Sequence, residues 1–184
     1  MPSSTERLVW IDLEMTGLNP DTDRIIEIAT IVTDLELNVV RQGPVFAINQ
    51  DDDILMSMDR WNTHTHNETG LVQRVQESEI TESIAEEKTL EFLSGLVKKN
   101  TSPLCGNTIC QDRRFLFRHM PKLEAFLHYR NIDVSTIKEL SDYWFPGFSR
   151  EFSKKNTHQA LNDIIESIEE LKFYRKHLLS KIVY

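Results

Sequence analysis

Residues 8–18, which read LVWIDLEMTGL, place two carboxylates inside an otherwise apolar run. The apolar residues predict a buried strand, and alternation with period two sends Asp12 and Glu14 to the same face. Burying two like charges this close costs several kcal/mol unless a cation lies between them, because each raises the pKa of the other. One interpretation of the pair is therefore a divalent metal site. The alternative is an edge strand whose acids face water.

The residues around the pair bear on this choice. Val9, Ile11 and Leu13 predict a core on the opposite face, so the alternative requires that the acidic face be fully solvated. Gly17 is expected to end the strand in a tight turn, which leaves Leu18 overhanging whatever the two acids hold.

Length and charge limit the class of protein. A chain of 184 residues, 40% of them hydrophobic, predicts one domain over residues 1–184 with a core at about 8–175. The absence of a secretory signal pattern and of a long apolar stretch predicts a cytoplasmic protein without a membrane segment. Cys105 and Cys110 are expected to be reduced, buried residues. The net charge of −8 argues against stable binding of long nucleic acid, but it is compatible with a short anionic substrate.

The pattern of apolar residues and turn residues predicts an α/β fold. Three strands in an antiparallel meander are expected at residues 8–18, 25–33 and 37–48, with further strands at 103–106 and 131–134. Helices are expected at 81–100 with Thr81 as N-cap, at 112–129 with a break at Pro121, at about 135–144 with Ser135 or Thr136 as cap, and at 159–179. Residues 51–70 read as a partly helical surface loop and 145–156 as a loop. Together these elements predict a mixed five-stranded sheet flanked by helices on both faces.

Two further acids occupy places where an acid is not needed locally. Asp112 opens a helix, where a carboxylate could simply stabilise the helix dipole. Asp163 lies in the final helix, where it could be a solvated residue. Since five residues turn a helix by about 500°, His158 would not share a helical face with Asp163. His158 is therefore expected on the loop or first turn before that helix, with Asn156 or Thr157 as its cap.

Four acids and one histidine are the components of phosphodiester hydrolysis with two metal ions. Because all the acidic ligands offer oxygen, Mg²⁺ or Mn²⁺ is favoured over zinc. His158, with an ordinary pKa of about 6.5, can take a proton from water at neutral pH.

The chain resembles the oligoribonucleases of the DEDDh 3′→5′ exonuclease family in three motifs: WIDLEMTGL with Asp12 and Glu14, GNTICQDRRF with Asp112, and THQALNDI with His158 and Asp163. The resemblance implies a ribonuclease H-like fold, a homodimer, and two Mg²⁺ or Mn²⁺ ions held by these four acids. It also implies that His158 is the general base and that very short RNA, including dinucleotides, is hydrolysed to mononucleotides. Thr108 and Cys110 depart from the family, which commonly has serine and glycine there.

The same resemblance implies a catalytic role for Tyr129 and roles in substrate binding for other residues. Leu18 and Trp61 would pinch two bases, and Tyr129 would reach the active centre across the dimer. The residues implied around the phosphate end of the substrate are His66, Thr108, Arg130, Ser135 and Thr136. Without the resemblance, Trp61 would more often be a plug between surface and core, and His66 a surface histidine.

Other functions share some of these features. Residues 12–16, read as a variant of an Asp-x-Asp-x-Thr motif, would suggest an aspartyl-phosphate phosphatase, but the later acid pair of that chemistry is missing. A non-catalytic oligonucleotide-binding module would give His158 no evident task. A DNA proofreading exonuclease would share all four acids, and short RNA and short DNA substrates would separate it from an exoribonuclease.

Overall fold

The computed structural model describes residues 6–153 and 158–178, which fold around a five-stranded sheet of order β3-β2-β1-β4-β5. The first three strands form an antiparallel meander, while β4 pairs in parallel with β1 and β5 in parallel with β4. This arrangement confirms the predicted mixed sheet. The strands are β1 (Leu8–Met15), β2 (Ile25–Thr33), β3 (Val39–Ala47), β4 (Leu104–Gly106) and β5 (Asn131–Asp133).

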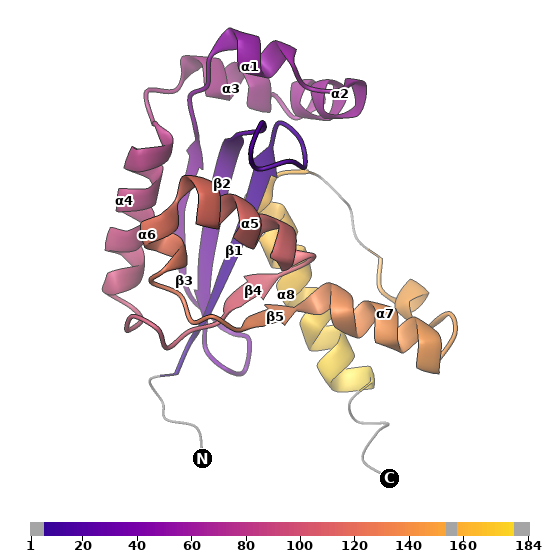
Figure 1. Cartoon of the computed structure of the whole chain (residues 1–184). Helices are drawn as coiled ribbons and strands as arrows, with labels where there is room; N and C mark the ends of the chain where they lie inside the picture. The colour runs from indigo at the N-terminus through magenta and orange to yellow at the C-terminus, as the bar shows by residue number, and fades with distance from the viewer. Residues whose placement is uncertain (1–5, 154–157, 179–184) are drawn as a thin grey trace.

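Helices cover both faces of this sheet (Figure 1). One face carries α4 (Glu82–Ser94), α5 (Ile109–His119) and α6 (Pro121–Glu124), while the other carries α7 (Val134–Trp144) and α8 (Ala160–His177). Within residues 6–153 and 158–178, no helix is both long and apolar enough to cross a membrane.

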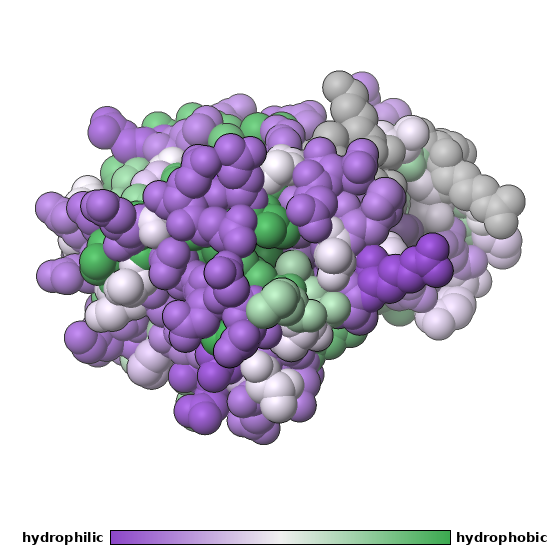
Figure 2. All heavy atoms as spheres, turned by 90° about the horizontal axis from the view of Figure 1, so that it is seen from above, coloured by the Kyte–Doolittle hydropathy of each residue, from purple (hydrophilic) through white to green (hydrophobic). Residues whose placement is uncertain are grey.

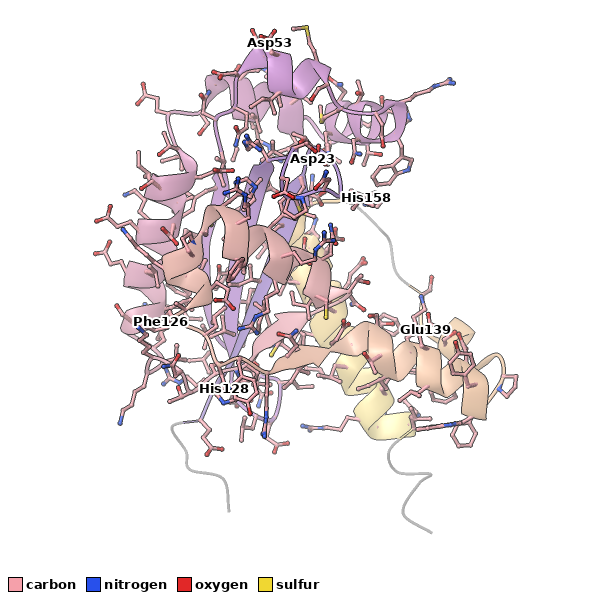
Figure 3. All side chains as sticks on the ribbon, viewed as in Figure 1. Asp23, Asp53, Phe126, His128, Glu139 and His158 are labelled. Carbon is pink, nitrogen blue, oxygen red and sulfur yellow. The ribbon has the colours of Figure 1, made fainter. Side chains whose placement is uncertain are left out.

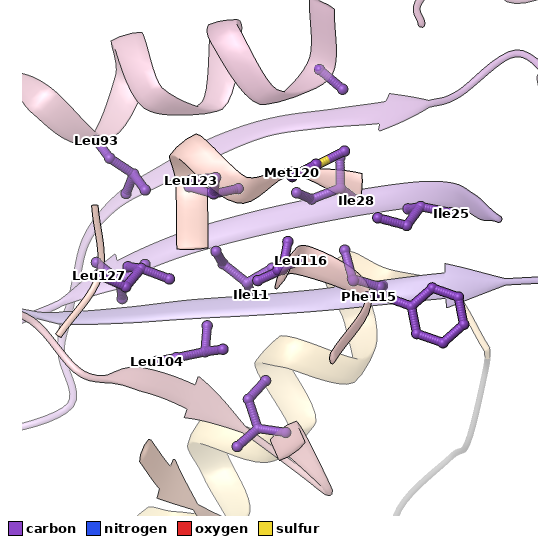
Figure 4. Packing of buried hydrophobic residues seen from close by; sticks show 14 of the residues in the cluster. Ile11, Ile25, Ile28, Leu93, Leu104, Phe115, Leu116, Met120, Leu123 and Leu127 are labelled. Carbon is purple, nitrogen blue, oxygen red and sulfur yellow. The ribbon is translucent and has the colours of Figure 1, made fainter. Parts of the chain in front are cut away.

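Strand β1 contributes to a core on each of its faces. Ile11 and its alternate neighbours pack with Phe115 and Leu116 of α5 (Figure 4). Trp10 and Leu8 point the other way, into a second cluster with residues of α8. Because Asp12 and Glu14 continue the face of Trp10, both acids point toward α8. The acidic face is therefore not the fully solvated one that the edge-strand alternative requires.

The segment predicted as a partly helical loop at residues 51–70 is more ordered than expected. It forms α1 (Asp52–Met56) and α2 (Arg60–Glu68), which are followed by α3 (Leu71–Glu77). Leu55, Leu71 and Val75 pack with Ile26 of the sheet in a small third cluster, so burial holds these short helices despite their weak periodicity. Figure 2 looks onto this end of the molecule and shows a mostly hydrophilic surface with a small apolar area.

Several helix ends differ from their predicted positions. The N-cap at Thr81 is confirmed, since its hydroxyl accepts the Ile84 N–H at 3.3 Å, but α4 ends at Ser94 and not at residue 100. The cap of α7 is Asp133, which accepts the Ser135 N–H at 3.0 Å, so the prediction of Ser135 or Thr136 was wrong. An acceptor at residue 133 suits the first turn better because it directly precedes the helix, which begins at Val134.

Two smaller predictions are also corrected. Cys105 is buried as expected, but Cys110 is exposed because α5 begins at Ile109 and turns this side chain to solvent. The break at Pro121 is confirmed, although α6 ends at Glu124, five residues before the predicted end. The predicted loop at 145–156 contains a short 3-10 helix, Phe148–Glu151.

Candidate active site

Three of the predicted metal ligands converge where β1 meets α8. Asp12 and Glu14 lie near the end of the strand, and Asp163 lies in the first turn of the helix. One carboxylate oxygen from each of the three acids lies within 4.8 Å of the others. These residues are about 150 positions apart in the chain, so tertiary packing brings them together.

Asp112 approaches the same place from α5. It is buried in the first turn of that helix, and its Oδ1 accepts the backbone N–H of Leu13 at 3.0 Å. Leu13 lies between Asp12 and Glu14, so this hydrogen bond ties the helix to the acidic part of β1. Asp112 also lines the same cavity as Asp12 and Asp163.

The crowding of carboxylates disfavours their ionised forms. Burial, followed by the charges of Asp112 and Glu14, raises the pKa of Asp12 well above its usual range. Burial, followed by the charge of Asp163, raises the pKa of Glu14 to about 8, and burial raises that of Asp112 to about 7. A bound cation would reverse these shifts. The oxygen-only donor set fits a hard divalent ion such as Mg²⁺ or Mn²⁺.

His158 lies two residues before α8, as the spacing to Asp163 predicted, with a backbone φ of 50°. Its ring meets the Trp61 ring edge-on at 5.4 Å between centroids, and both side chains line the cavity of the acids. Figure 3 places His158 at the upper end of the sheet. Gln159 occupies the N-cap position, and the predicted caps Asn156 and Thr157 lie outside the described residues.

The cavity has a volume of about 450 Å³ and combines acids with apolar side chains. Leu18 and Trp61 are 73% and 58% exposed, as residues at the rim would be. The turn that carries Leu18 is held closely, because Gln111 Nε2 donates to the Leu18 carbonyl at 2.6 Å. A Cβ at Gly17 would lie 2.5 Å from the carboxylate of Asp23, so a larger residue here would have to displace that side chain.

Three of the predicted phosphate contacts lie together beside the cavity. Thr108 lines it, with a left-handed φ of 51°, and donates its N–H to Asp133 Oδ1 at 3.0 Å and to Ser135 Oγ at 3.2 Å. The Ser135 hydroxyl donates to the same Asp133 oxygen at 2.6 Å. Thr136 follows on the exposed side of α7.

The other predicted substrate residues lie elsewhere in this chain. His66 is 1% exposed, with Nε2 3.1 Å from the Met15 carbonyl and Nδ1 3.9 Å from Glu14, so it packs behind the acids. Tyr129 and Arg130 are exposed between α6 and β5 and are not among the cavity's lining residues. Their neighbour His128 lies at the opposite end of the sheet from His158 (Figure 3).

Sequence reasoning missed several residues at the site. Glu166 lines the cavity three positions after Asp163, and helical spacing could have identified it. Asn107 donates to Ser167 Oγ at 2.7 Å and to Glu170 Oε2 at 3.2 Å, which joins the turn before α5 to α8. No local pattern signals that contact, because its partners are 60 and 63 residues away.

Comparison with known proteins assigns the family. A family model described as Exonuclease matches residues 9–171. The oligoribonuclease of Alkalilimnicola ehrlichii is 59% identical over 179 residues, which are 97% of this chain and 93% of the relative. The oligoribonuclease of Pseudomonas aeruginosa is 59% identical over 174 residues, which are 95% of this chain and 97% of the relative. The chain belongs to the oligoribonuclease family of exonucleases.

Similar solved structures support the fold of this family. Exonuclease I of E. coli in complex with a dT13 oligonucleotide superposes with a TM-score of 0.74 at 17% identity, over 96% of this chain and 42% of that one. Exonuclease I of Methylocaldum szegediense gives 0.71 at 20% identity, over 95% of this chain and 41% of that one. The ribonuclease H-like fold is thereby confirmed. Membership of an exonuclease family also sets aside the aspartyl-phosphate phosphatase.

Proposed function

We propose that this protein is a 3′→5′ exoribonuclease that hydrolyses very short RNA, including dinucleotides, to mononucleotides. The observation that carries the proposal is the convergence of Asp12, Glu14 and Asp163 within 4.8 Å in a chain of the oligoribonuclease family. Burial at this point raises the pKa of two of these acids, which favours a cation as the missing partner. Two Mg²⁺ or Mn²⁺ ions held by these acids and Asp112 would meet that need.

The chain's own residues have separate tasks in this reaction. When bound, the cations would supply Lewis-acid activation of water and charge stabilisation at the leaving oxygen. Asp112, fixed to Leu13, and Asp163, fixed in the first turn of α8, hold their carboxylates at the cavity. His158 lines the same cavity and takes the proton of the attacking water as general base.

Substrate binding would rest on stacking and on a few contacts at one end. Leu18 and Trp61 at the rim pinch the two bases, and each stacked base contributes about 1 to 3 kcal/mol. Thr108, Ser135 and Thr136 bind the phosphate end together with Arg130, whereas His66, which is buried, supports the strand behind the acids. A net charge of −8 leaves no long basic track, so longer RNA gains few contacts.

Tyr129 and Arg130 require a second subunit in this proposal. Both are exposed and do not line the cavity of their own chain, which favours a homodimer in which each subunit completes the other's site. Activity per chain should then fall on dilution in parallel with dimer dissociation, measured by analytical ultracentrifugation. Full activity of an isolated monomer would contradict this part of the proposal.

The deciding experiment uses purified protein and labelled RNA of two, five and twenty nucleotides, with Mg²⁺, Mn²⁺ or EDTA. We expect the dinucleotide to be cleaved at least as well as the longer chains, and EDTA to abolish cleavage. The affinity for RNA should depend only weakly on salt concentration, because the protein contacts only about 1 to 3 phosphates. Clear preference for the twenty-mer would contradict the short-substrate proposal. Equal cleavage of a DNA dinucleotide would contradict the restriction to RNA.

A further inference from the structure

A fifth carboxylate, Glu27 on β2, lies next to the acids but has other partners. It is 2% exposed and pairs in register with Glu14 of β1, so both side chains leave the sheet on the same face. Its Oε1 forms a salt bridge with Arg74 of α3, and its Oε2 accepts the backbone N–H of Ala160 at 3.0 Å. Both oxygens are therefore already engaged, and Glu27 does not line the acid-lined cavity.

The hydrogen bond to Ala160 holds the beginning of α8. The first N–H groups of a helix have no partner within the helix, and the N-cap Gln159 gives none from its side chain. Glu27, which lies on a strand 133 residues away in sequence, supplies an acceptor for one of these groups, the N–H of Ala160. A buried carboxylate is also the favourable charge at a helix N-terminus.

Two residues of the proposed mechanism flank this anchored position. His158 lies two residues before Ala160 in a left-handed conformation, and Asp163 lies three residues after it. The N–H of Asp163 donates to the Gln159 carbonyl at 3.0 Å, so it belongs to the same first turn. Any movement of Ala160 would shift the base and a metal ligand together.

We propose that Glu27 and Arg74 are positioning residues, which hold the first turn of α8 so that His158 and Asp163 face the reacting atoms. Arg74 fixes one oxygen of Glu27 and thereby aims the other at Ala160. Neither residue touches substrate, and the inference rests on the proposed function of His158 and Asp163. A displacement of about 1 Å at such groups can cost about 100-fold in rate.

The test compares Glu27→Gln with Arg74→Gln at saturating Mg²⁺ on an RNA dinucleotide. Arg74 and the Ala160 N–H bind different oxygens of Glu27, and glutamine at position 27 would place a donating NH2 group at one of these two positions, so it cannot accept from both. We expect kcat to fall about 10- to 100-fold in Glu27→Gln and about 3- to 10-fold in Arg74→Gln, with KM changed less than about threefold. The double variant should lose little more than Glu27→Gln, because Arg74 acts through Glu27. Arg74→Lys should retain most of the activity.

The two substitutions also separate positioning from simple electrostatics. Glu27→Gln removes a negative charge near the acids, whereas Arg74→Gln removes a positive one, so a pure charge effect on cation binding would have opposite signs. Loss of positioning would instead lower kcat in both variants. If Arg74→Gln keeps or raises kcat while Glu27→Gln lowers it, the proposal is overturned.

A second readout needs neither substrate nor metal. Hydrogen exchange at the Ala160 amide, measured by NMR in metal-free protein, should lose protection in both variants. The matched control is Arg175→Gln. The side chain of Arg175 is 47% exposed, close to the 43% of Arg74, and it is also paired with a glutamate, Glu36, at 2.9 Å. It should change neither kcat nor exchange at Ala160.

The outcomes separate this inference from the proposed function. Wild-type protein that fails to cleave RNA overturns the proposed function, while exchange at Ala160 still reports on the anchor. Unchanged exchange and kcat in folded variants overturn the inference alone. If Glu27→Gln does not fold, Arg74→Gln decides, because Arg74 is on the surface.

Discussion

Two sets of acids lie inside this fold, and their surroundings are opposite. Glu86 on α4 accepts the N–H groups of Lys122 and Leu123, and Glu27 is held by a guanidinium and by the start of α8. Asp12 and Glu14 instead lie against other carboxylates, which together with burial raise their pKa values. The first set connects elements of the fold, while the second destabilises the fold when its acids are ionised.

This difference distinguishes Glu27 and Glu86 from Asp12 and Glu14 by their partners, while Asp112 combines both situations, since it accepts the Leu13 N–H beside the other acids. A buried carboxylate that receives N–H donors lowers its own cost of burial. A carboxylate placed beside other carboxylates has no such compensation for its burial, so its position in the fold requires another explanation. The same change, acid to amide, should therefore affect the two sets differently.

The largest effect is expected from Asp163→Asn. Loss of one ligand charge should reduce kcat by about 10⁴-fold or more, because cation binding and charge stabilisation both suffer. The metal-free protein should become more stable, since one like charge is removed from the cluster. Steady-state kinetics with an RNA dinucleotide and denaturant unfolding in EDTA measure the two effects. Robust turnover in excess Mg²⁺ would refute the role of Asp163.

His158→Ala should also reduce the rate but by another route. We expect kcat to fall about 10²- to 10⁴-fold, because the general base is lost while the acids remain. Calorimetric titration with Mn²⁺ should show unchanged cation affinity, unlike Asp163→Asn. Equal loss of cation affinity in both variants would place His158 among the ligands and not at the proton transfer.

The sequence alone predicted those parts of the site that depend on local patterns and did not predict those that depend on contacts between distant residues. The acidic strand and the final helix followed from periods of two and 3.6, so Asp12, Glu14 and Asp163 could be placed on their elements. Residues 51–70 were predicted as only partly helical because the burial of these short helices comes from contacts with the sheet. The anchoring of Ala160 by Glu27 leaves no local pattern, since a contact between residues 27 and 160 depends on the finished fold.

The pH dependence of stability should reveal the uncompensated set. In the unfolded chain Glu14 ionises near its ordinary pKa of 4.5, whereas in the folded metal-free chain its pKa is about 8. The folded state thus keeps a proton that the unfolded state releases. The contribution of this proton to the free energy of unfolding is complete below about pH 4.5 and is lost as pH rises to about 8. We expect the free energy of unfolding in EDTA to fall by on the order of 3 kcal/mol between about pH 5 and pH 8.5.

Urea unfolding across this pH range measures the effect. Saturating Mg²⁺ should remove most of the decline, because a cation favours the ionised acids. Glu14→Gln should make the decline in EDTA smaller, and the raised pKa values of Asp12 and Asp112 should preserve the rest of it. A stability that rises over the same range would mean that the acids are already compensated within the chain.

Trp61→Ala probes the cavity without changing a charge. Loss of one stacking surface should raise KM for a dinucleotide by about 5- to 100-fold, which corresponds to about 1 to 3 kcal/mol, with kcat changed less. Trp144→Ala is the matched control, since Trp144 is 57% exposed, close to the 58% of Trp61, and does not line the cavity. An unchanged KM for Trp61→Ala would show that binding resides elsewhere.

Glu86→Gln gives the smallest expected effect and the sharpest contrast with Asp163→Asn. The carboxylate Oε1 accepts the Lys122 N–H at 2.6 Å and the Leu123 N–H at 3.0 Å, and so caps α6 from α4. Glutamine keeps an acceptor oxygen but loses the charge, so we expect the free energy of unfolding to drop by about 1 kcal/mol, with kcat and KM unchanged. Denaturant unfolding in EDTA should therefore shift in opposite directions for the same chemical change at residues 86 and 163. A shift in the same direction would mean that partners do not distinguish the two sets, and that burial alone governs both.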